Sequence, residues 1–116
     1  MEFEVKKVEF ELAEDVDDIK FIGLFYVFAE KYVPRIKIFL EKSVKFRFKK
    51  EISLNTLSNI LAKIQKNTPY AIKEIKHKVE DQKVEVKIEK KNKWKKSKML
   101  DKYAKHFGLL LFLGIK

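Results

Sequence analysis

The chain has 116 residues, which is room for one domain with one hydrophobic core, and we expect residues 1–116 to form a single domain. Hydrophobic residues make up 46% of it, ten of them Phe, which excludes a chain that stays disordered for lack of apolar side chains. The absence of Cys excludes disulfides, thiolate metal sites and Cys nucleophiles, and the three Gly leave no glycine-rich phosphate loop.

The formal net charge of +10 is unevenly distributed along the sequence. Residues 1–34 carry four Lys against nine Asp and Glu, whereas residues 35–116 carry 23 Lys and Arg against eight acids. A strongly basic segment suits a polyanionic partner. The alternative is compositional, because enrichment in Lys and Glu is also typical of hyperthermophile proteins and requires no ligand.

The first predicted element is a strand over residues 3–12, where apolar and charged side chains alternate. The alternation slips by one residue at Lys6 and Lys7, which predicts a bulge. Residues 1–4 are acidic rather than basic and lack the apolar core of a secretory signal, so we expect a cytoplasmic protein.

The second element is a helix over residues 16–33, built around the uncharged run 21–29. It is too short and too closely flanked by charges to span a membrane. Because it has no polar face, we expect it to pack on most of its sides, with Asp15 as its N-cap and Pro34 as its stop.

A β-hairpin is predicted next, with its turn at residues 41–43. The side chains of one face would pack in the core, namely Ile36, Ile38, Leu40, Val44, Phe46 and Phe48. The other face would present Lys37, Phe39, Lys45, Arg47 and Lys49 to solvent.

Ser53 is placed to cap an amphipathic helix whose apolar residues recur every three or four positions up to Ile64, and residues 67–69 end it. Residues 70–80 fit either a helix or a strand. We favour a strand that forms a hairpin with residues 83–89, because those alternate cleanly and a strand needs a neighbour.

The C-terminal part begins with residues 90–98, six of them Lys, which we interpret as an exposed basic loop or arm. Ser97 would cap a last helix that ends at Gly108. The uncharged run at 109–113 would form a final strand, buried in the core of the domain or paired with a second copy in a homodimer.

Together these elements predict an α+β fold: a ferredoxin-like βαββαβ-type antiparallel sheet with two helices on one face and a C-terminal helix-strand extension. One sheet face would then be free, and small RNA-binding domains of this architecture use that face, an analogy of fold alone. The aromatic and glycine signature of RNA-recognition motifs is absent, and the residues identify no family.

No catalytic motif is present, so we predict a protein that is not an enzyme and has no cofactor or metal. The two histidines, His77 and His106, have no partner at ligand spacing. One acidic cluster precedes the first helix, at Glu14, Asp15, Asp17 and Asp18, and helix capping explains it more simply than a divalent cation does.

The basic residues predict a non-enzymatic nucleic-acid-binding domain, for RNA or a nucleoprotein assembly. The predicted contacts are Lys45, Arg47, Lys49, Lys90, Lys91, Lys93, Trp94, Lys95, Lys96 and Lys98, with phosphates bound by the charges and a base stacked on the indole. Alternatively, Trp94 anchors the arm on the core and the lysines only solvate it. With two Arg in the chain, we expect recognition of backbone or shape rather than sequence.

The alternative function is a protein-interaction subunit, an assembly factor or inhibitor of viral or mobile-element origin. It would use the acidic N-terminal third or the apolar C-terminus.

Overall fold

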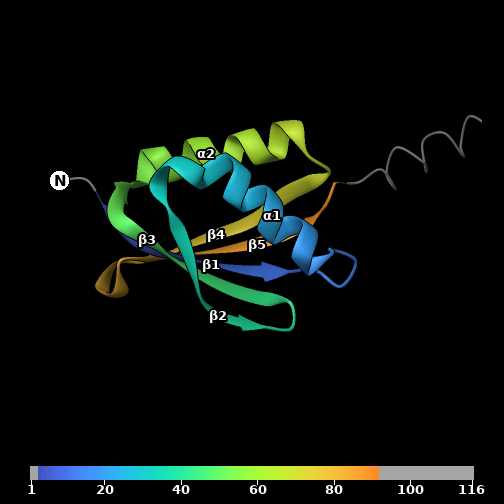
Figure 1. The fold of residues 1–116 in the computed structure, drawn as a ribbon, viewed down its shortest axis with the longest axis horizontal. Helices are drawn as coiled ribbons and strands as arrows, with labels where there is room; N and C mark the ends of the chain where they lie inside the picture. Colours follow the sequence, from blue (N-terminus) through green and yellow to red (C-terminus); the bar gives the residue numbers. More distant parts are fainter. Residues whose placement is uncertain (1–2, 92–116) are drawn as a thin grey trace, which may run out of the picture.

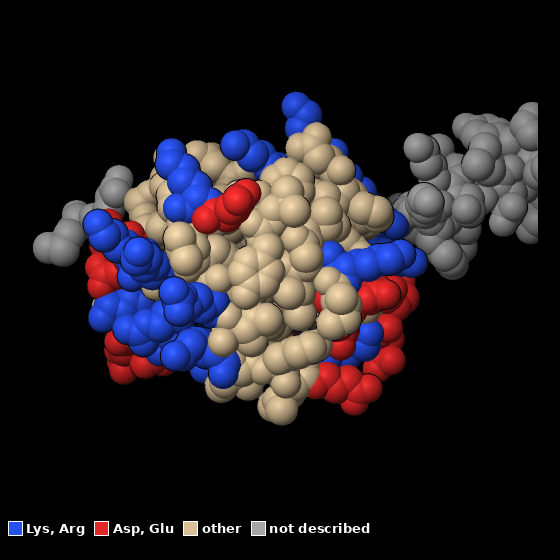
Figure 2. All heavy atoms as spheres, viewed as in Figure 1, with Lys and Arg blue, Asp and Glu red and all other residues tan. Residues whose placement is uncertain are grey.

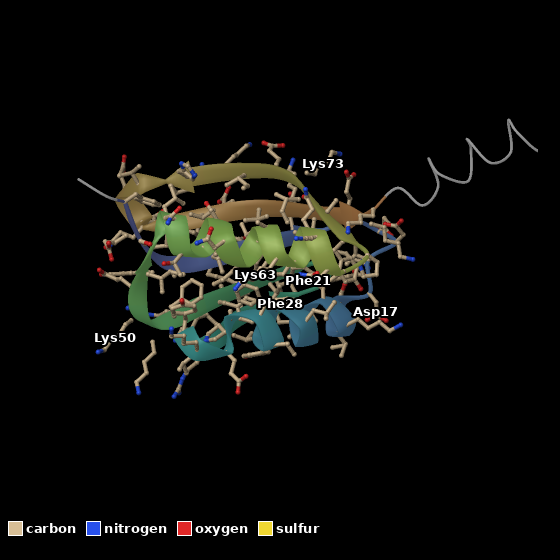
Figure 3. All side chains as sticks on the ribbon, turned by 90° about the horizontal axis from the view of Figure 1, so that it is seen from above. Asp17, Phe21, Phe28, Lys50, Lys63 and Lys73 are labelled. Carbon is tan, nitrogen blue, oxygen red and sulfur yellow. The ribbon has the colours of Figure 1, made fainter. Side chains whose placement is uncertain are left out.

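The computed structural model describes residues 3–91, which form an α+β fold of two α-helices and a five-stranded mixed sheet (Figure 1). The elements in chain order are β1 (Glu4–Leu12), α1 (Asp18–Ala29), the 3-10 turn η1 (Glu30–Tyr32), β2 (Pro34–Leu40), β3 (Ser43–Ser53), α2 (Leu54–Asn67), β4 (Tyr70–Lys78), the 3-10 turn η2 (Val79–Asp81) and β5 (Lys83–Lys90). Both α-helices lie on one face of the sheet, and no described element covers the other (Figures 1 and 3). We call that second face the uncovered face.

The sheet order corrects the predicted ferredoxin-like arrangement. The strands lie in the order β2-β3-β1-β5-β4, and β1 pairs with β5 in parallel while the other neighbours are antiparallel. The sheet is therefore mixed and has five strands, because β5 folds back from β4 and takes the place beside β1. Sequence alternation identified the strands, but it carries no information on which strand pairs with which.

The hydrophobic core lies between the helices and the sheet and is rich in aromatic rings, as the ten Phe suggest. Phe10 of β1 packs edge-to-face against Phe21 and Phe25 of α1, with ring centroids 4.8 Å apart in both cases. Phe46 of β3 closes the cluster, 4.6 Å from Phe25. All four side chains are fully buried, so they anchor α1 to the middle of the sheet.

The helix α1 is shorter than predicted and less buried. It spans 12 residues, and its N-cap is Asp17 instead of Asp15: the Asp17 carboxylate accepts a hydrogen bond from the backbone N–H of Lys20 at 3.1 Å. Only one side of the helix faces the core, while Ile19 and Val27 are each 68% exposed. The prediction that it packs on most sides was wrong for these described residues, since an apolar sequence does not by itself supply a covering element.

The hairpin of β2 and β3 forms as predicted, with its turn at Glu41 and Lys42, and Lys42 adopts φ of 61°. A bulge between Ile36 and Ile38 corrects the predicted facing of β2. Phe39 consequently lies opposite buried Val44 on the helix side. Ile38 and Leu40 then fall on the uncovered side, because a one-residue slip exchanges the two faces of a strand. Pro34 begins β2, after Val33 in the left-handed conformation.

The remaining predicted elements within the described residues are confirmed. Ser53 caps α2 by accepting a hydrogen bond from the backbone N–H of Thr56 at 3.0 Å, and the apolar stripe of α2 is buried. Residues 70–80 form β4 and the start of η2, and β4 pairs with β5 in a hairpin. The bulge in β1 also occurs at the predicted place, between Val5 and Lys7.

Neither of the two α-helices in residues 3–91 could span a membrane, since α1 has 12 residues and α2 has 14. The predicted basic arm beyond Lys91, the last helix and the strand at 109–113 lie outside the described residues, as does His106.

Candidate nucleic-acid interface

The uncovered face of the sheet carries charged side chains because the strands alternate. In β1, Val8 and Phe10 are buried against the helices, so Lys7, Glu9 and Glu11 point to the opposite side. The same alternation in β3 and β5 places every second residue on the uncovered face. The cross-strand register then determines which charges become neighbours.

One line of positions across this face is basic in all five strands. The register pairs Arg35 with Arg47, Arg47 with Lys7, Lys7 with Lys83, and Lys83 with Lys78. Opposite residues of paired strands point to the same side of a sheet. These five side chains therefore form one continuous line, which we call the cationic row.

The cationic row crosses the whole width of the sheet. Neighbouring strands lie about 4.8 Å apart, so the five Cα positions span about 19 Å. Arg35, Arg47 and Lys78 are exposed, and Lys7 is half-buried. No ion pair among the described residues involves any of these four side chains, so among residues 3–91 their charge is not neutralised by a carboxylate.

Lys83 differs from the rest of the cationic row because two carboxylates hold it. Its ammonium lies 3.1 Å from Glu9 and 3.2 Å from Glu85, and its side chain is only 15% exposed. The hydrogen bond that the Lys83 ammonium donates to Glu9, with smaller contributions from Glu85, raises the pKa of Lys83 above its ordinary value, although burial acts in the opposite direction. Lys83 therefore stays charged at physiological pH, and its ion pair with Glu9 joins β5 to β1 beside Lys7, the central residue of the row.

Beyond the row, the uncovered face changes to a mixed-charge region. It consists of Glu9, Glu11, Lys45, Glu74, Lys76, Glu85 and Lys87. Lys87 lies 3.7 Å from Glu74 and 3.9 Å from Glu11, and Lys76 lies 3.5 Å from Glu74. A hollow of about 360 Å³ opens among these side chains. Four carboxylates, those of Glu9, Glu11, Glu74 and Glu85, thus lie on this side of the cationic row, while Glu51 lies on the other side, 3.5 Å from Lys6.

The three predicted contacts in the hairpin are placed in different surroundings. Arg47 belongs to the cationic row, whereas Lys45 lies one position further along the face, opposite Glu9. Lys49 lines a shallow hollow near η1 together with Lys31 and Lys50.

Two of the predicted C-terminal contacts, Lys90 and Lys91, lie within the described residues, and both are distant from the cationic row. Lys90 ends β5 opposite Tyr70, seven residues from Lys83, which corresponds to about 23 Å along a strand. Lys91 follows it, and its backbone N–H donates to the carbonyl of Pro69 at 2.6 Å. Lys93, Trp94, Lys95, Lys96 and Lys98 lie outside the described residues.

Four members of the cationic row, Lys7, Arg35, Lys78 and Lys83, were not among the predicted site residues. The alternation of each strand indicates that they point away from the core. Their alignment depends on the bulges in β1, β2 and β4 and on the position of β5 beside β1. The prediction relied on the high density of Lys in the run at 90–98. The cationic row has no such density in the sequence, because each strand contributes a single residue.

Other candidate groups within the described residues carry no site. His77 lies on the helix side of β4, where its ring is 5.8 Å from that of Phe3. Asp17 caps α1, and Asp18 forms an ion pair with Lys42 at 3.2 Å. Residues 3–91 contain no group of three or more acidic or His side chains arranged to hold a metal ion.

Comparison of the chain with protein-family models, curated sequences and solved structures finds no match. Its function must therefore be inferred from its own residues.

Proposed function

We propose that the chain is a non-enzymatic nucleic-acid-binding domain, with RNA favoured, that binds phosphates on the uncovered face of its sheet. The observation that carries the proposal is the cationic row, in which each of the five strands contributes one basic residue at the same level. Each ammonium or guanidinium that neutralises a phosphate releases a counterion, which supplies affinity without reading sequence.

The shape of the row favours an extended single strand over a duplex. A single strand can place successive phosphates along the row, whereas each strand of a duplex winds away from such a line around the helix axis. Sheet faces of small α+β domains also bind single-stranded RNA in other proteins, a likeness of architecture alone.

The carboxylates of the mixed-charge region limit the binding surface on one side of the cationic row. Glu9 and Glu85 flank the row at its centre, and Glu11 and Glu74 lie further along the same face. A phosphate chain would be repelled from that side and held on the row. The described residues of the uncovered face in β1, β3 and β5 include no aromatic side chain, so we expect contacts with phosphates rather than stacking there.

The experiment measures binding of a fluorescein-labelled single-stranded polyuridylate by anisotropy at several salt concentrations. Four phosphate contacts, from Lys7, Arg35, Arg47 and Lys78, predict a slope of log K against log salt of about −2.8, because the charge of Lys83 is already balanced by Glu9 and Glu85. The row variant changes Lys7, Arg35, Arg47 and Lys78 to Gln and keeps Lys83, because its ion pairs support the sheet. This variant should lose most of the slope.

A matched control changes Lys20, Lys63, Lys66 and Lys73 to Gln, which removes the same charge from exposed positions outside the row. The control should keep most of the slope. Equal losses in both variants, or no binding by the natural chain at low salt, would overturn the proposal. Equal affinity for duplex and single strands would reject the preference for single strands.

A protein-interaction subunit is the second candidate. It is supported by the apolar side chains that α1 and β2 leave exposed, among them Ile19, Val27 and Leu40.

A further inference from the structure

The outer side of α1 is apolar and open to solvent. Ile19 and Val27 are each 68% exposed, and Tyr26 lies beside Val27 with 36% exposed. Gly23 falls between them on the same side, and a Cβ atom there would meet no atom within 4 Å apart from its chain neighbours and the backbone of its own helix. Gly is costly in a helix interior, and packing within one copy gives no reason for it, whereas it would let a neighbouring chain approach the helix closely.

The edge strand β2 continues this apolar surface. Val33 and Pro34 line a hollow with Tyr26 and Val27, so the start of β2 and the outer side of α1 are contiguous. Four further apolar side chains of β2 are exposed along this edge strand: Ile36 and Phe39 on the helix side, and Ile38 and Leu40 on the uncovered side. We call the exposed apolar residues of α1 and β2, with Gly23 and Val33, the apolar edge. A hydrophobic edge of this length is a surface that proteins normally cover.

Charges of opposite sign lie at the two ends of the apolar edge. Figure 2 shows an uncharged area with most of the neighbouring basic side chains on its left, where some acidic side chains also lie at the rim, and most of the acidic side chains on its right, where some basic side chains lie among them. The basic end includes Lys31, Lys49 and Lys50 around one hollow, which Glu51 also lines. The other end includes Glu14 and Glu41 around a hollow that is lined by four Glu and three Lys. In Figure 3, Lys50 and Asp17 mark the same two ends.

We propose that the apolar edge is the contact between two copies of this chain. A two-fold axis normal to the sheet runs the two β2 strands antiparallel and places the basic end of each copy against the acidic end of the other. The same surface is thus complementary to itself in both hydrophobicity and charge, as a two-fold interface requires.

The contact is made by side chains and does not require one continuous sheet. The bulge between Ile36 and Ile38 interrupts the regular hydrogen-bonding edge of β2. Both helices and both uncovered faces keep their positions relative to the sheet. The row residues of β3, β1, β5 and β4 therefore stay accessible in each copy, while Arg35 lies on the contacting strand β2.

The first test is sedimentation equilibrium of the full chain after nuclease treatment and at high salt, where polyanion bridging is lost. We expect a monomer–dimer equilibrium at micromolar concentrations. Val27→Lys and Leu40→Lys should each weaken the dimer by about tenfold or more, because they bury an unpaired charge.

Val79→Lys is the matched control, since Val79 is apolar and 67% exposed but lies on η2, outside the apolar edge. It should leave the dimer unchanged. A monomer at all concentrations, as expected if this surface binds a different protein, overturns the proposal. So does a dimer that Val27→Lys and Leu40→Lys leave intact, or one that Val79→Lys breaks.

A second test addresses the antiparallel orientation through charge reversal. Lys50→Glu and Glu41→Lys, measured at low salt, should each weaken the dimer, because like charges then meet at both ends. The double variant restores opposite charges and should recover the natural affinity. Circular dichroism confirms that every variant is folded, and failure of the double variant to recover dimerisation overturns the two-fold arrangement.

Discussion

The two helices cover the same face of the sheet with different side-chain patterns. In α2, the buried residues are Leu57, Ile60, Leu61 and Ile64, and most of the outward positions are polar. In α1, Phe21, Ile22, Phe25 and Ala29 are buried, but the outward side is apolar as well.

This difference shows which part of the sequence the fold of one copy explains. Packing on the sheet accounts for the whole pattern of α2, because its apolar stripe is as wide as its contact. For α1 it accounts only for the inward side. The outward side of α1 is contiguous with exposed apolar residues of β2. The apolar side chains that the core does not use are therefore part of one exposed surface.

The largest expected effect tests the two sides of α1 against each other. Phe25→Ala removes a fully buried ring that contacts Phe10 and Phe46, and it should lower the free energy of unfolding by about 3–5 kcal/mol. Val27→Ala, two residues later on the exposed side, should change it by less than about 0.5 kcal/mol. Urea denaturation of dilute protein, where the monomer dominates, measures both.

Similar losses for the two variants would contradict this contrast. They would mean that Val27 is covered within a single copy. Leu57→Ala serves as the reference in α2 because Leu57 is also fully buried, and it should cost about 2–5 kcal/mol.

A smaller effect is expected at the helix starts, where each helix has one capping side chain. Asp17→Ala removes the acceptor for the backbone N–H of Lys20, and Ser53→Ala removes the acceptor for that of Thr56. Each should lower the free energy of unfolding by about 1 kcal/mol. Asp15→Ala, the cap expected from sequence, should be nearly neutral in the same thermal or urea melts, and a loss equal to that of Asp17→Ala would contradict the observed cap.

Local signals in the sequence were sufficient for much of this fold. The regular stripe of α2 and the Ser53 cap predicted that helix, and the alternation of residues 83–89 predicted β5. The bulge at Lys6 and Lys7 was also visible as a slip in phase. Each of these features is determined by residues close together in the chain.

Features that depend on distant residues were not predictable in the same way. The apolar run at 21–29 gave no sign of which side would lack a cover, since that depends on β2 being an edge strand. The second bulge, at Ile36–Ile38, exchanged the faces of Phe39 and Leu40 without an evident signal. The cationic row needs the register of all five strands, which no single strand encodes.

Gly23→Ala should stabilise the monomer, in contrast to most substitutions. The added methyl group meets no atom within 4 Å apart from its chain neighbours and the backbone of its own helix, and Ala is the better helix former. The free energy of unfolding of dilute protein should rise by about 0.5–1 kcal/mol. A decrease would show that the backbone at Gly23 is constrained within one copy. Packing within one copy would then explain this glycine, and a neighbouring chain would not be needed.

The smallest effect appears only at high pH and concerns Tyr70. This residue begins β4, next to both helices. Its ring packs edge-to-face against Phe21 of α1 with centroids 5.6 Å apart, and its backbone N–H donates to Thr68 just after α2. Burial, and secondarily the Asp17 carboxylate, raises the pKa of Tyr70 above its ordinary value of 10.0.

Between that value and the raised pKa, the unfolded phenol has lost its proton while the folded one keeps it. The unfolded state therefore binds fewer protons, and the free energy of unfolding falls as the pH rises above about 10. Tyr70→Phe should be nearly neutral at pH 7 and should reduce this alkaline loss in urea melts between pH 9 and pH 11.

The substitution should not abolish the loss, because the pKa of Lys83 is raised as well, chiefly by its hydrogen bond with Glu9. Deprotonation of Lys83 therefore lowers the free energy of unfolding in the same pH range. An unchanged alkaline loss in the variant would show that the phenol between α1 and α2 is accessible to water, and that the two helices close over β4 less tightly than their packing indicates.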